Sequence, residues 1–251
     1  MAIKIKKNER IDDLQYENLK IIQDTEGFCF GIDSVILSDF IKEAKAGSTI
    51  VDLGTGTGIL SILLSKKTLA GNIIGIEIQK EVAEMAKRSV KLNNLEKKIK
   101  IINADINEIV KNKDIEKNTV DIIVTNPPYK GTKDGGVNEN EKKLISRHET
   151  TATLEDFIDV SSQLLKDRGC MYMVHKPERL ADIIYFQRLH KIEPKEIRFV
   201  YPNNQSEASL VLVKGIKGAN KFLKIDKPLY IYDENGRYTK EIYKIYNIKE
   251  K

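Results

Sequence analysis

The chain has 251 residues, of which 41% are hydrophobic and 31% are charged. These proportions are typical of a globular protein and exclude the collagen, coiled-coil and disordered classes. Lys and Arg number 42 against 37 Asp and Glu, and residues 214–251, with ten basic and five acidic residues, carry the whole net charge of +5. This basic segment indicates either attraction to phosphate or a solvated Lys-rich surface.

The two cysteines, Cys29 and Cys170, lack the spacing of a disulfide framework or a metal site, which favours core thiols in a reducing compartment. The first ten residues lack the apolar core of a signal peptide. The longest uncharged run, residues 53–65, is shorter than the roughly 18 residues that a membrane helix needs. We therefore expect a cytoplasmic protein that binds neither a membrane nor a metal, and the oligomeric state stays open.

Residues 1–48 are predicted to form an N-terminal cap on the domain that follows. This segment has a Lys-rich start, a strand around Leu19 to Ile22 and a helix over Ser34 to Ala44. No internal repeat marks a second domain. The cap is therefore expected to belong to a single-domain protein.

Residues 49–217 alternate short β-branched runs with amphipathic helical patterns, which is typical of stacked βαβ units. The predicted strands cover residues 48–53, 72–77, 98–104, 120–125, 170–175, 196–201 and 209–216. The predicted helices cover residues 57–67, 80–93, 154–167 and 178–190. This alternation predicts an α/β core with a mainly parallel sheet.

Two segments outside these elements have open interpretations. The glycine-rich loop 130–143 indicates a substrate lid, or disorder without function. The extension 218–251 interleaves basic residues with five tyrosines, a pattern that can bind single-stranded RNA. The simpler interpretation is an edge strand at residues 229–232 followed by a helix face, with Tyr238, Ile242 and Tyr246 packed on the core.

A glycine-rich turn follows the first core strand, in the run Asp52-Leu-Gly54-Thr-Gly56-Thr-Gly58. Glycines let the backbone turn tightly and approach a ligand closely. The spacing departs from the dinucleotide pattern, because Ile59 stands where the third glycine is needed. An acid before the first glycine also disfavours a pyrophosphate, so the turn indicates a ligand with positive charge.

Acidic residues follow the next two strands as well. Glu77 ends the second strand, where a carboxylate can accept both ribose hydroxyls, and Asp105 follows the third strand. The carboxyl ends of parallel strands meet at one crevice, where open α/β sheets bind ligands. The three acids therefore favour S-adenosylmethionine, a cationic nucleoside, with a helix N-cap as the alternative role of Asp105.

The fourth strand ends in Asn126-Pro127-Pro128-Tyr129. The two prolines fix the backbone, so that the Asn126 side-chain oxygen and the Pro127 carbonyl can accept hydrogen bonds from a planar amine. Such an arrangement suits methyl transfer, which depends on positioning and charge stabilisation. Tyr129 offers a flat ring on which a flipped-out base can stack.

These two motifs together resemble class I S-adenosylmethionine-dependent methyltransferases of the N6-adenine group. Further segments resemble the bacterial tRNA1(Val) (adenine-N6)-methyltransferase family, namely residues 28–40, 146–157, 173–184, 207–218 and 228–239. The resemblance covers most of the chain from about Ile11. It implies a Rossmann-like fold with a seven-stranded, mostly parallel sheet, helices on both faces and an antiparallel last hairpin. It also implies methylation of the adenosine 3′ of the valine anticodon in tRNA, with S-adenosylmethionine as cofactor.

The resemblance also implies roles for individual residues. The cofactor-binding set is Asp33, Asp52, Gly54, Gly56, Gly58, Glu77, Asp105, Ile106 and Asn126. Within it, Asp52, Gly54 and Gly58 are placed at the methionine end. Asp33 lies near the mouth of the site, although an N-cap of helix 34–44 is an equal alternative.

The substrate residues follow from the same resemblance. The catalytic set that holds the target base is Asn126, Pro127, Pro128 and Tyr129. Four weaker candidates for contacts with the tRNA anticodon arm are Arg147, His148, Lys176 and Arg179, each of which could equally be a surface charge.

Three rival functions remain at this point. A glutamine N5-methyltransferase of release factors would use the same tetrapeptide on a side-chain amide, but a longer helical N-terminal domain is expected there. A DNA or rRNA N6-adenine methyltransferase is the second rival, and 251 residues leave little room for a DNA-recognition domain. A nucleotide-binding module without catalysis is the third, and it would have no use for the tetrapeptide.

Overall fold

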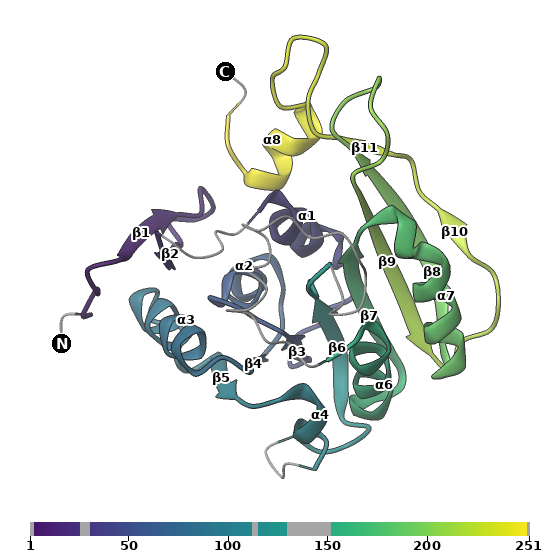
Figure 1. The fold of residues 1–251 in the computed structure, drawn as a ribbon, viewed down its shortest axis with the longest axis horizontal. Coiled ribbons are helices and arrows are strands. Elements are labelled where there is room, and N and C mark those ends of the chain that lie inside the picture. The colour runs from purple at the N-terminus through teal and green to yellow at the C-terminus, as the bar shows by residue number, and fades with distance from the viewer. Residues whose placement is uncertain (1–2, 26–30, 112–114, 130–151, 250–251) are drawn as a thin grey trace, which may run out of the picture.

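A central mixed sheet organises the protein, which a computed structural model describes for residues 3–25, 31–111, 115–129 and 152–249 (Figure 1). Over these residues the sheet has nine strands, in the order β10-β8-β9-β7-β6-β3-β4-β5, and β11 pairs with the outer side of β8. The strands are β3 (Thr49–Leu53), β4 (Asn72–Glu77), β5 (Ile99–Asn103), β6 (Val120–Thr125), β7 (Leu165–His175), β8 (Ile192–Tyr201), β9 (Leu210–Lys217), β10 (Lys224–Ile225) and β11 (Leu229–Tyr230). Within this sheet, as far as the structure describes it, β9 alone runs antiparallel to its neighbours, β7 and β8.

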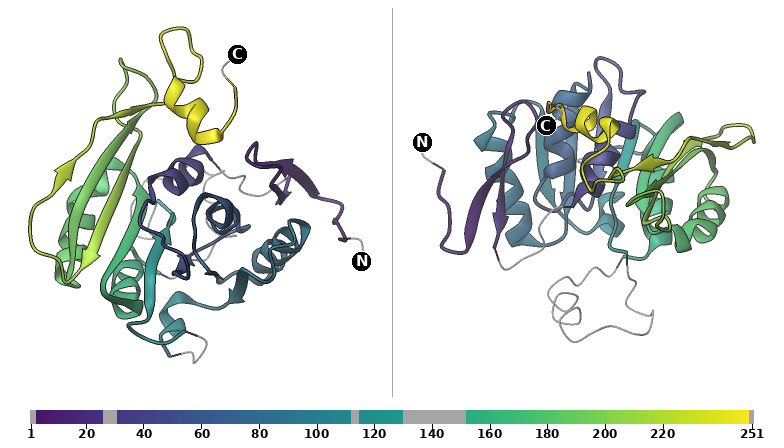
Figure 2. Two further views of the ribbon diagram at one scale, coloured as in Figure 1. Left: turned by 180° about the vertical axis from the view of Figure 1, so that it is seen from behind. Right: turned by 90° about the horizontal axis from the view of Figure 1, so that it is seen from above.

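Helices cover both faces of the sheet, as the views from behind and above show (Figure 2). One face carries α1 (Ile32–Phe40), α2 (Ile59–Lys67) and α3 (Lys80–Leu92), and the other carries α4 (Ile106–Ile109), α6 (Leu154–Leu164) and α7 (Leu180–Leu189). Alternate residues of each strand serve the two cores: on β3, Ile50 packs with the first helices and Val51 with the second. Among the described residues, no helix is long and apolar enough to cross a membrane.

All seven predicted core strands are present, and the predicted α/β class is confirmed. The sheet exceeds the predicted seven strands because the C-terminal extension adds β10 and β11, each of two residues. The helix predicted over 154–167 ends at Leu164, because Leu165 already pairs with Val120 at the start of β7. A register shift follows that pair, so the exposed residues 166–168 do not alternate like a strand.

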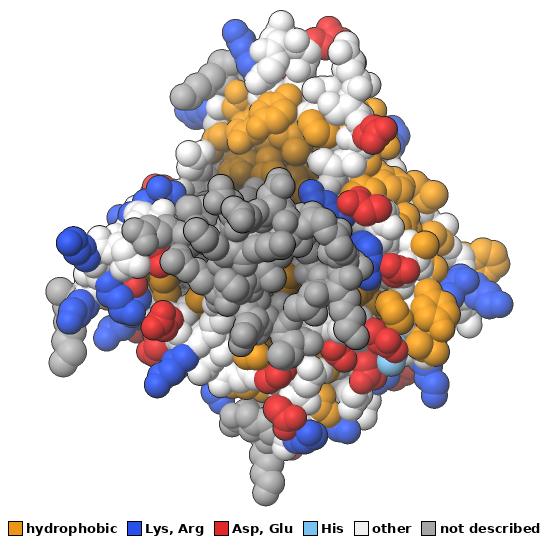
Figure 3. All heavy atoms as spheres, viewed as in Figure 1, with side chains coloured by type: hydrophobic (Ala, Val, Ile, Leu, Met, Phe, Trp, Pro, Cys, Tyr) orange, Lys and Arg blue, Asp and Glu red, His pale blue; other side chains and the backbone are white. Residues whose placement is uncertain are grey.

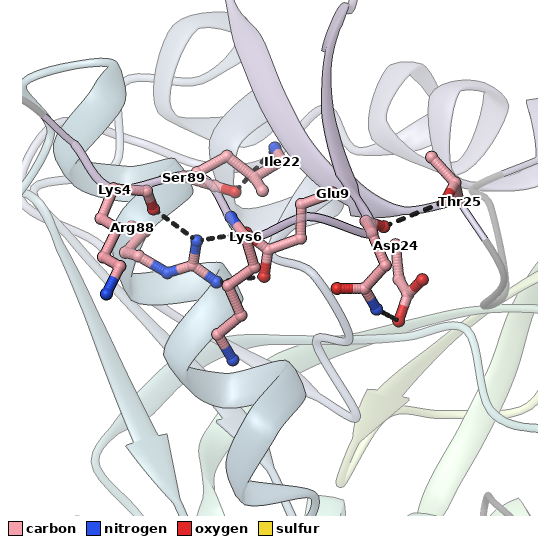
Figure 4. Close-up of polar contacts among 9 residues, drawn as sticks. Lys4, Lys6, Glu9, Ile22, Asp24, Thr25, Arg88 and Ser89 are labelled. Carbon is pink, nitrogen blue, oxygen red and sulfur yellow. Dashed lines mark hydrogen bonds and ion pairs between the residues drawn. The ribbon is translucent and has the colours of Figure 1, made fainter.

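The N-terminal segment contains a hairpin of β1 (Glu9–Asp13) and β2 (Lys20–Asp24), of which only the second strand was predicted. The first strand was missed because its sequence is charged and largely exposed, so it lacks the alternation of apolar and polar residues that predicts a strand. The hairpin lies on α3, where Arg88 makes two hydrogen bonds to the Glu9 carboxylate at 2.6 and 2.7 Å and one to the Lys4 carbonyl (Figure 4). The Ile22 amide also donates to Ser89 Oγ at 3.0 Å. These bonds attach the hairpin to the core.

The helix predicted over 34–44 is α1, which begins at Ile32 and ends at Phe40. It lies against α8 (Lys240–Tyr246) of the C-terminal extension. Ile242 and Ile245 of α8 are buried, so the predicted packing of this helix on the core is confirmed. Tyr238 precedes the helix instead of lying on its face, and its ring stacks on that of Tyr246 at 5.8 Å between centroids.

The remaining predictions for this part of the molecule concern the loop 130–143 and the two cysteines. The possible lid at 130–143 and Cys29 lie outside the described residues. Cys170 is a buried free thiol, as predicted.

Candidate active site

The glycine-rich turn connects β3 to α2 and is held to the neighbouring strand. The backbone amides of Gly54 and Thr55 both donate to the Ile76 carbonyl of β4, at 3.0 and 2.9 Å. Gly56 has φ of 57°, a conformation that disfavours a side chain, and a Cβ at this position would meet nothing within 4 Å. The turn therefore presents bare backbone to open space at Gly56.

Asp52 lies beneath this turn and is almost completely buried. Its Oδ2 accepts hydrogen bonds from Thr55 Oγ1 at 2.6 Å and Ser61 Oγ at 2.8 Å. Burial raises the pKa of Asp52 to about 6, although the two hydroxyls oppose this shift. The carboxyl group thus ties the turn to the first residues of α2, and a direct contact with a ligand stays a prediction.

Glu77 ends β4 on the same side of the sheet. Its Oε2 accepts from the Gly56 amide at 3.0 Å and its Oε1 from the Gln79 amide at 2.9 Å. Burial raises the pKa of Glu77. The carboxylate is therefore adjacent to the open part of the glycine turn, as the sequence predicts for a ribose-binding acid.

Asp105 follows β5 and caps α4, since its Oδ1 accepts from the Asn107 amide at 2.9 Å. The N-cap alternative for this residue is therefore confirmed. Ile106 begins α4 and is buried. Because β3, β4 and β5 are parallel neighbours, Asp105 shares the carboxyl edge of the sheet with Glu77.

The tetrapeptide after β6 is joined to α1 through two side chains. Asn126 Nδ2 donates to the buried Ser34 Oγ at 3.2 Å, and Tyr129 Oη donates to Asp33 Oδ2 at 2.6 Å. The first bond uses one of the two amide hydrogens of Asn126 and leaves its side-chain oxygen as an acceptor for another partner. The cap helix thus orients the residues predicted to hold the target base.

Asp33 is a partner of Tyr129, and it is not the N-cap of its helix. Gly31 occupies the N-cap position, and Asp33 lies in the first turn, where its Oδ1 accepts from the Ser34 amide at 3.0 Å. The N-cap alternative for Asp33 was therefore wrong, because α1 begins two residues earlier than predicted. Burial and the charge of Asp33 raise the pKa of Tyr129 far above its usual range, so the phenol keeps its proton.

The end of β7 packs against Tyr129. The His175 ring meets the Tyr129 ring edge-on at 5.3 Å between centroids, and Lys176 Nζ lies over the same ring at 5.3 Å. Burial, together with the positive charge of Arg179, lowers the pKa of His175 to about 4. The Lys176 amide donates to His175 Nδ1 at 2.8 Å, which a neutral imidazole accepts.

Of the four weaker substrate candidates, the structure brings Lys176 to the site. Arg179 pairs with Asp182 at 2.7 Å. Arg147 and His148 lie outside the described residues. Among the described residues, no group of three or more His, Cys, Asp or Glu side chains could hold a metal ion.

Sequence reasoning missed two residues of this site, Ser34 and His175. Ser34 directly follows the candidate Asp33, and its role depends on the approach of α1 to the end of β6, which local patterns do not report. His175 ends a predicted strand beside β6, and that position was the available signal.

This chain is similar in sequence to known methyltransferases. The model of the methyltransferase small domain family matches residues 30–193, which is more than half of the chain. Three similar relatives carry the name tRNA1(Val) (adenine(37)-N6)-methyltransferase. The Flavobacterium johnsoniae protein is 23% identical over 90% of this chain and 94% of its own, and the Proteus mirabilis protein is 25% identical over 83% and 82%. The Porphyromonas gingivalis protein is 29% identical, and this chain spans 64% of its length.

Solved structures show the same fold. A structure described as a predicted O-methyltransferase from Agrobacterium tumefaciens superposes with a TM-score of 0.70 at 21% identity, over 86% of this chain and 95% of the other. The M. jannaschii protein TYW2, solved in complex with AdoMet, gives a TM-score of 0.57 at 17% identity, over 86% and 89% of the two chains. The fold is therefore that of class I methyltransferases, and the resemblance found in the motifs is confirmed. The chain belongs to the methyltransferase small domain family.

Proposed function

We propose that this protein is an S-adenosylmethionine-dependent methyltransferase that modifies the exocyclic N6 of an adenine in tRNA, namely the adenosine 3′ of the valine anticodon. The observation that carries the proposal is the anchoring of Asn126 and Tyr129 by Ser34 and Asp33 at the carboxyl edge of the sheet. The names of the relatives support the choice of tRNA and of adenine N6. A cytoplasmic location and the anticodon arm as partner are parts of this proposal.

The residues at the sheet edge fit S-adenosylmethionine. The open space at Gly56 admits a ligand against the backbone, and Glu77 beside it can accept ribose hydroxyl hydrogens. Asp105 and Ile106 would flank the adenine, while Asp52 keeps the turn in shape. When bound, this cofactor supplies an electrophilic methyl group.

The target amine is held by acceptors of this chain. The Asn126 side-chain oxygen and the Pro127 carbonyl accept its two N–H hydrogens, which aims the nitrogen lone pair away from them. With the amine held in this way, the nitrogen would be placed to accept the methyl group that the cofactor supplies, and one N–H proton would then leave to solvent. The Tyr129 ring supports the base by stacking, because the bond to Asp33 and the contact with His175 fix its plane.

The remaining parts of the chain frame this site. We propose that residues 49–217 form the methyltransferase core, 1–48 the cap and 218–251 the basic extension. In this division the cap supplies Asp33 and Ser34, so the catalytic pocket is incomplete without it.

The test is methyl transfer from labelled S-adenosylmethionine to unmodified tRNA, to release factor and to DNA in separate reactions. We expect label in tRNA alone, recovered as N6-methyladenosine. Label only in release factor would mean that the tetrapeptide serves a glutamine amide, and label in DNA would point to the second rival.

The matched variant is Asn126→Ala. Loss of one preorganised hydrogen-bond partner in an active site commonly lowers kcat by about 100-fold or more. We expect that loss in tRNA methylation, with cofactor affinity changed by less than about twofold. Loss of both properties together would assign Asn126 to folding or to the cofactor.

A further inference from the structure

An open cavity lies at the surface between two loops of the C-terminal half. It has a volume of about 620 Å³ and is lined by residues 203–205, 232–234 and Gly236. The methyl-transfer chemistry described above uses none of these residues.

The two loops are held in shape by their own polar groups. Asn203 Oδ1 accepts from the Gln205 amide at 2.9 Å, and Asp233 Oδ1 accepts from the Asn235 amide at 2.9 Å. The Tyr232 amide donates to the Pro202 carbonyl at 2.8 Å and so joins one loop to the other. The cavity is therefore built by the fold.

The chemistry of the lining suits the edge of a nucleobase. Asn204, Gln205 and Glu234 are exposed there, and amide and carboxylate groups are the side chains that pair with base edges. Two carboxylates in the lining, those of Asp233 and Glu234, disfavour a phosphate group. The extension is rich in basic residues, which attract phosphates in general.

Tyr232 adds an aromatic surface and is 41% exposed. Its ring stacks on Tyr238 at 5.5 Å and an interplanar angle of 16°, and Tyr238 stacks on Tyr246 at 5.8 Å and 12°. The three parallel rings form a ladder whose exposed end is at the cavity. A nucleobase can stack on the exposed ring at the end of such a row and extend it by one more parallel ring.

The inner end of the ladder approaches the active site. Tyr246 belongs to α8, which lies against α1, the helix that carries Asp33. Asp33 in turn accepts the hydroxyl of Tyr129. Figure 3 shows hydrophobic side chains gathered in a hollow in the upper part of the view, where Figure 1 places α8 and α1.

We propose that this cavity binds an unpaired nucleobase of the RNA substrate, stacked on Tyr232 and bonded along its edge by residues 204, 205 and 234. The inference rests on the proposed function, because the three stacked tyrosines connect the cavity to α8, which lies against the helix α1 that holds the proposed base-binding tetrapeptide. It assigns to the extension the recognition of a nucleotide that flanks the target.

The experiment measures binding of the full chain to an unmodified valine anticodon stem-loop that carries 2-aminopurine beside the target adenosine. Stacking quenches the fluorescence of this base analogue. For Tyr232→Ala we expect a dissociation constant raised by about tenfold and loss of the quenching. Tyr232→Phe keeps the ring and is expected to keep both, as is Tyr185→Ala, which removes an exposed tyrosine from α7.

Three results would overturn the proposal. The first is an unchanged dissociation constant for Tyr232→Ala. The second is a dissociation constant for Tyr232→Phe as high as that for Tyr232→Ala. The third is a loss of affinity in Tyr185→Ala equal to that in Tyr232→Ala. If the wild-type chain still methylates tRNA in those cases, the proposed function stands and the nucleobase site alone fails. A wild-type chain that binds no RNA and labels only release factor would overturn both.

Discussion

Asn126 can act as an acceptor only if its amide group keeps one orientation, and the Ser34 hydroxyl is the group that holds it. Removing this hydroxyl leaves Asn126 in place and frees the amide to rotate. For Ser34→Ala we expect kcat to fall by about three- to tenfold, since a hydrogen bond of this kind contributes about 1 kcal/mol. The KM for tRNA is expected to stay within about twofold, because the ring of Tyr129 is untouched.

Ser38→Ala is the matched control for that variant. Ser38 is buried on the same helix, but its hydroxyl donates within the helix, to the Val35 carbonyl at 2.6 Å. Steady-state kinetics should therefore separate the two variants. Equal kcat values for Ser34→Ala and Ser38→Ala would show that Ser34 does not position Asn126.

His175 makes the stability of the protein depend on pH. The folded protein keeps the imidazole neutral down to a pKa of about 4, whereas the unfolded chain takes up a proton near its ordinary value of 6.5. The contribution of the neutral His175 to the free energy of unfolding is therefore fully present above about pH 6.5, and it is lost as the pH drops toward 4. At about pH 5 the expected loss relative to neutral pH is about 2 kcal/mol.

Urea unfolding of the wild type and of His175→Gln, at neutral pH and at about pH 5, measures how much of the loss of unfolding free energy is due to His175. The variant cannot titrate at this position, so its loss of unfolding free energy over the same interval should be smaller by about 2 kcal/mol. Equal losses in the two proteins would mean that His175 is protonated in the folded state.

Among single residues, the sequence motifs predicted that Asn126, Tyr129 and Glu77 belong to the site, since each lies at or just after the end of a predicted strand. The sequence could not predict that Asp33 bonds Tyr129, because 96 residues separate the two positions along the chain. Such a contact depends on how α1 crosses the end of the sheet, and no local period encodes it.

Among the elements, the β1–β2 hairpin is attached to α3 in part by an ion pair between Arg88 and Glu9. The Glu9 carboxylate is 2% exposed, and hydrogen bonding by Arg88 lowers its pKa. Arg88→Ala would leave this carboxylate buried without its partner, at a cost of about 2 kcal/mol. We expect faster hydrogen exchange in β1 and β2, with the exchange of β3 to β6 unchanged.

Lys87→Ala provides the comparison on the same helix. Lys87 pairs with Glu84 at the surface, where both side chains are well exposed, so its loss should change the stability by less than about 0.5 kcal/mol. Hairpin exchange rates that respond equally to the two variants would contradict a specific role for the Arg88–Glu9 pair.

The elements with strong periodicity were predicted closely, and those held by tertiary contacts were not. α3 was expected over 80–93 and covers Lys80–Leu92, because its buried residues recur at helical spacing. β8 was expected from 196 but begins at Ile192, since the sheet tolerates Pro194 at a register shift. β10 and β11 are defined by their pairing with β8. Each has two residues, which is too short for a pattern of alternating hydrophobicity to be recognised in the sequence.

For the molecule as a whole, the sheet gathers the ends of β3 to β7 at one edge, and the chain's two additions complete that edge. The cap contributes α1, which holds the catalytic tetrapeptide, and the extension contributes α8, which lies against α1. Net charge alone does not reveal this division, because the value of +5 does not show that residues 214–251 carry all of it while residues 1–213 are neutral overall. A change in either addition is therefore expected to reach the active site through α1.

The most direct measurement of the central claim is nucleoside mapping of tRNA from a strain that lacks this gene and carries either the wild-type gene or the Asn126→Ala variant. Mass spectrometry of ribonuclease fragments gives the methylation of the adenosine 3′ of the valine anticodon. We expect N6-methyladenosine to be absent at this position in the deletion strain, to return with the wild-type gene and not to return with the variant. Unchanged N6-methyladenosine in the deletion strain would contradict it.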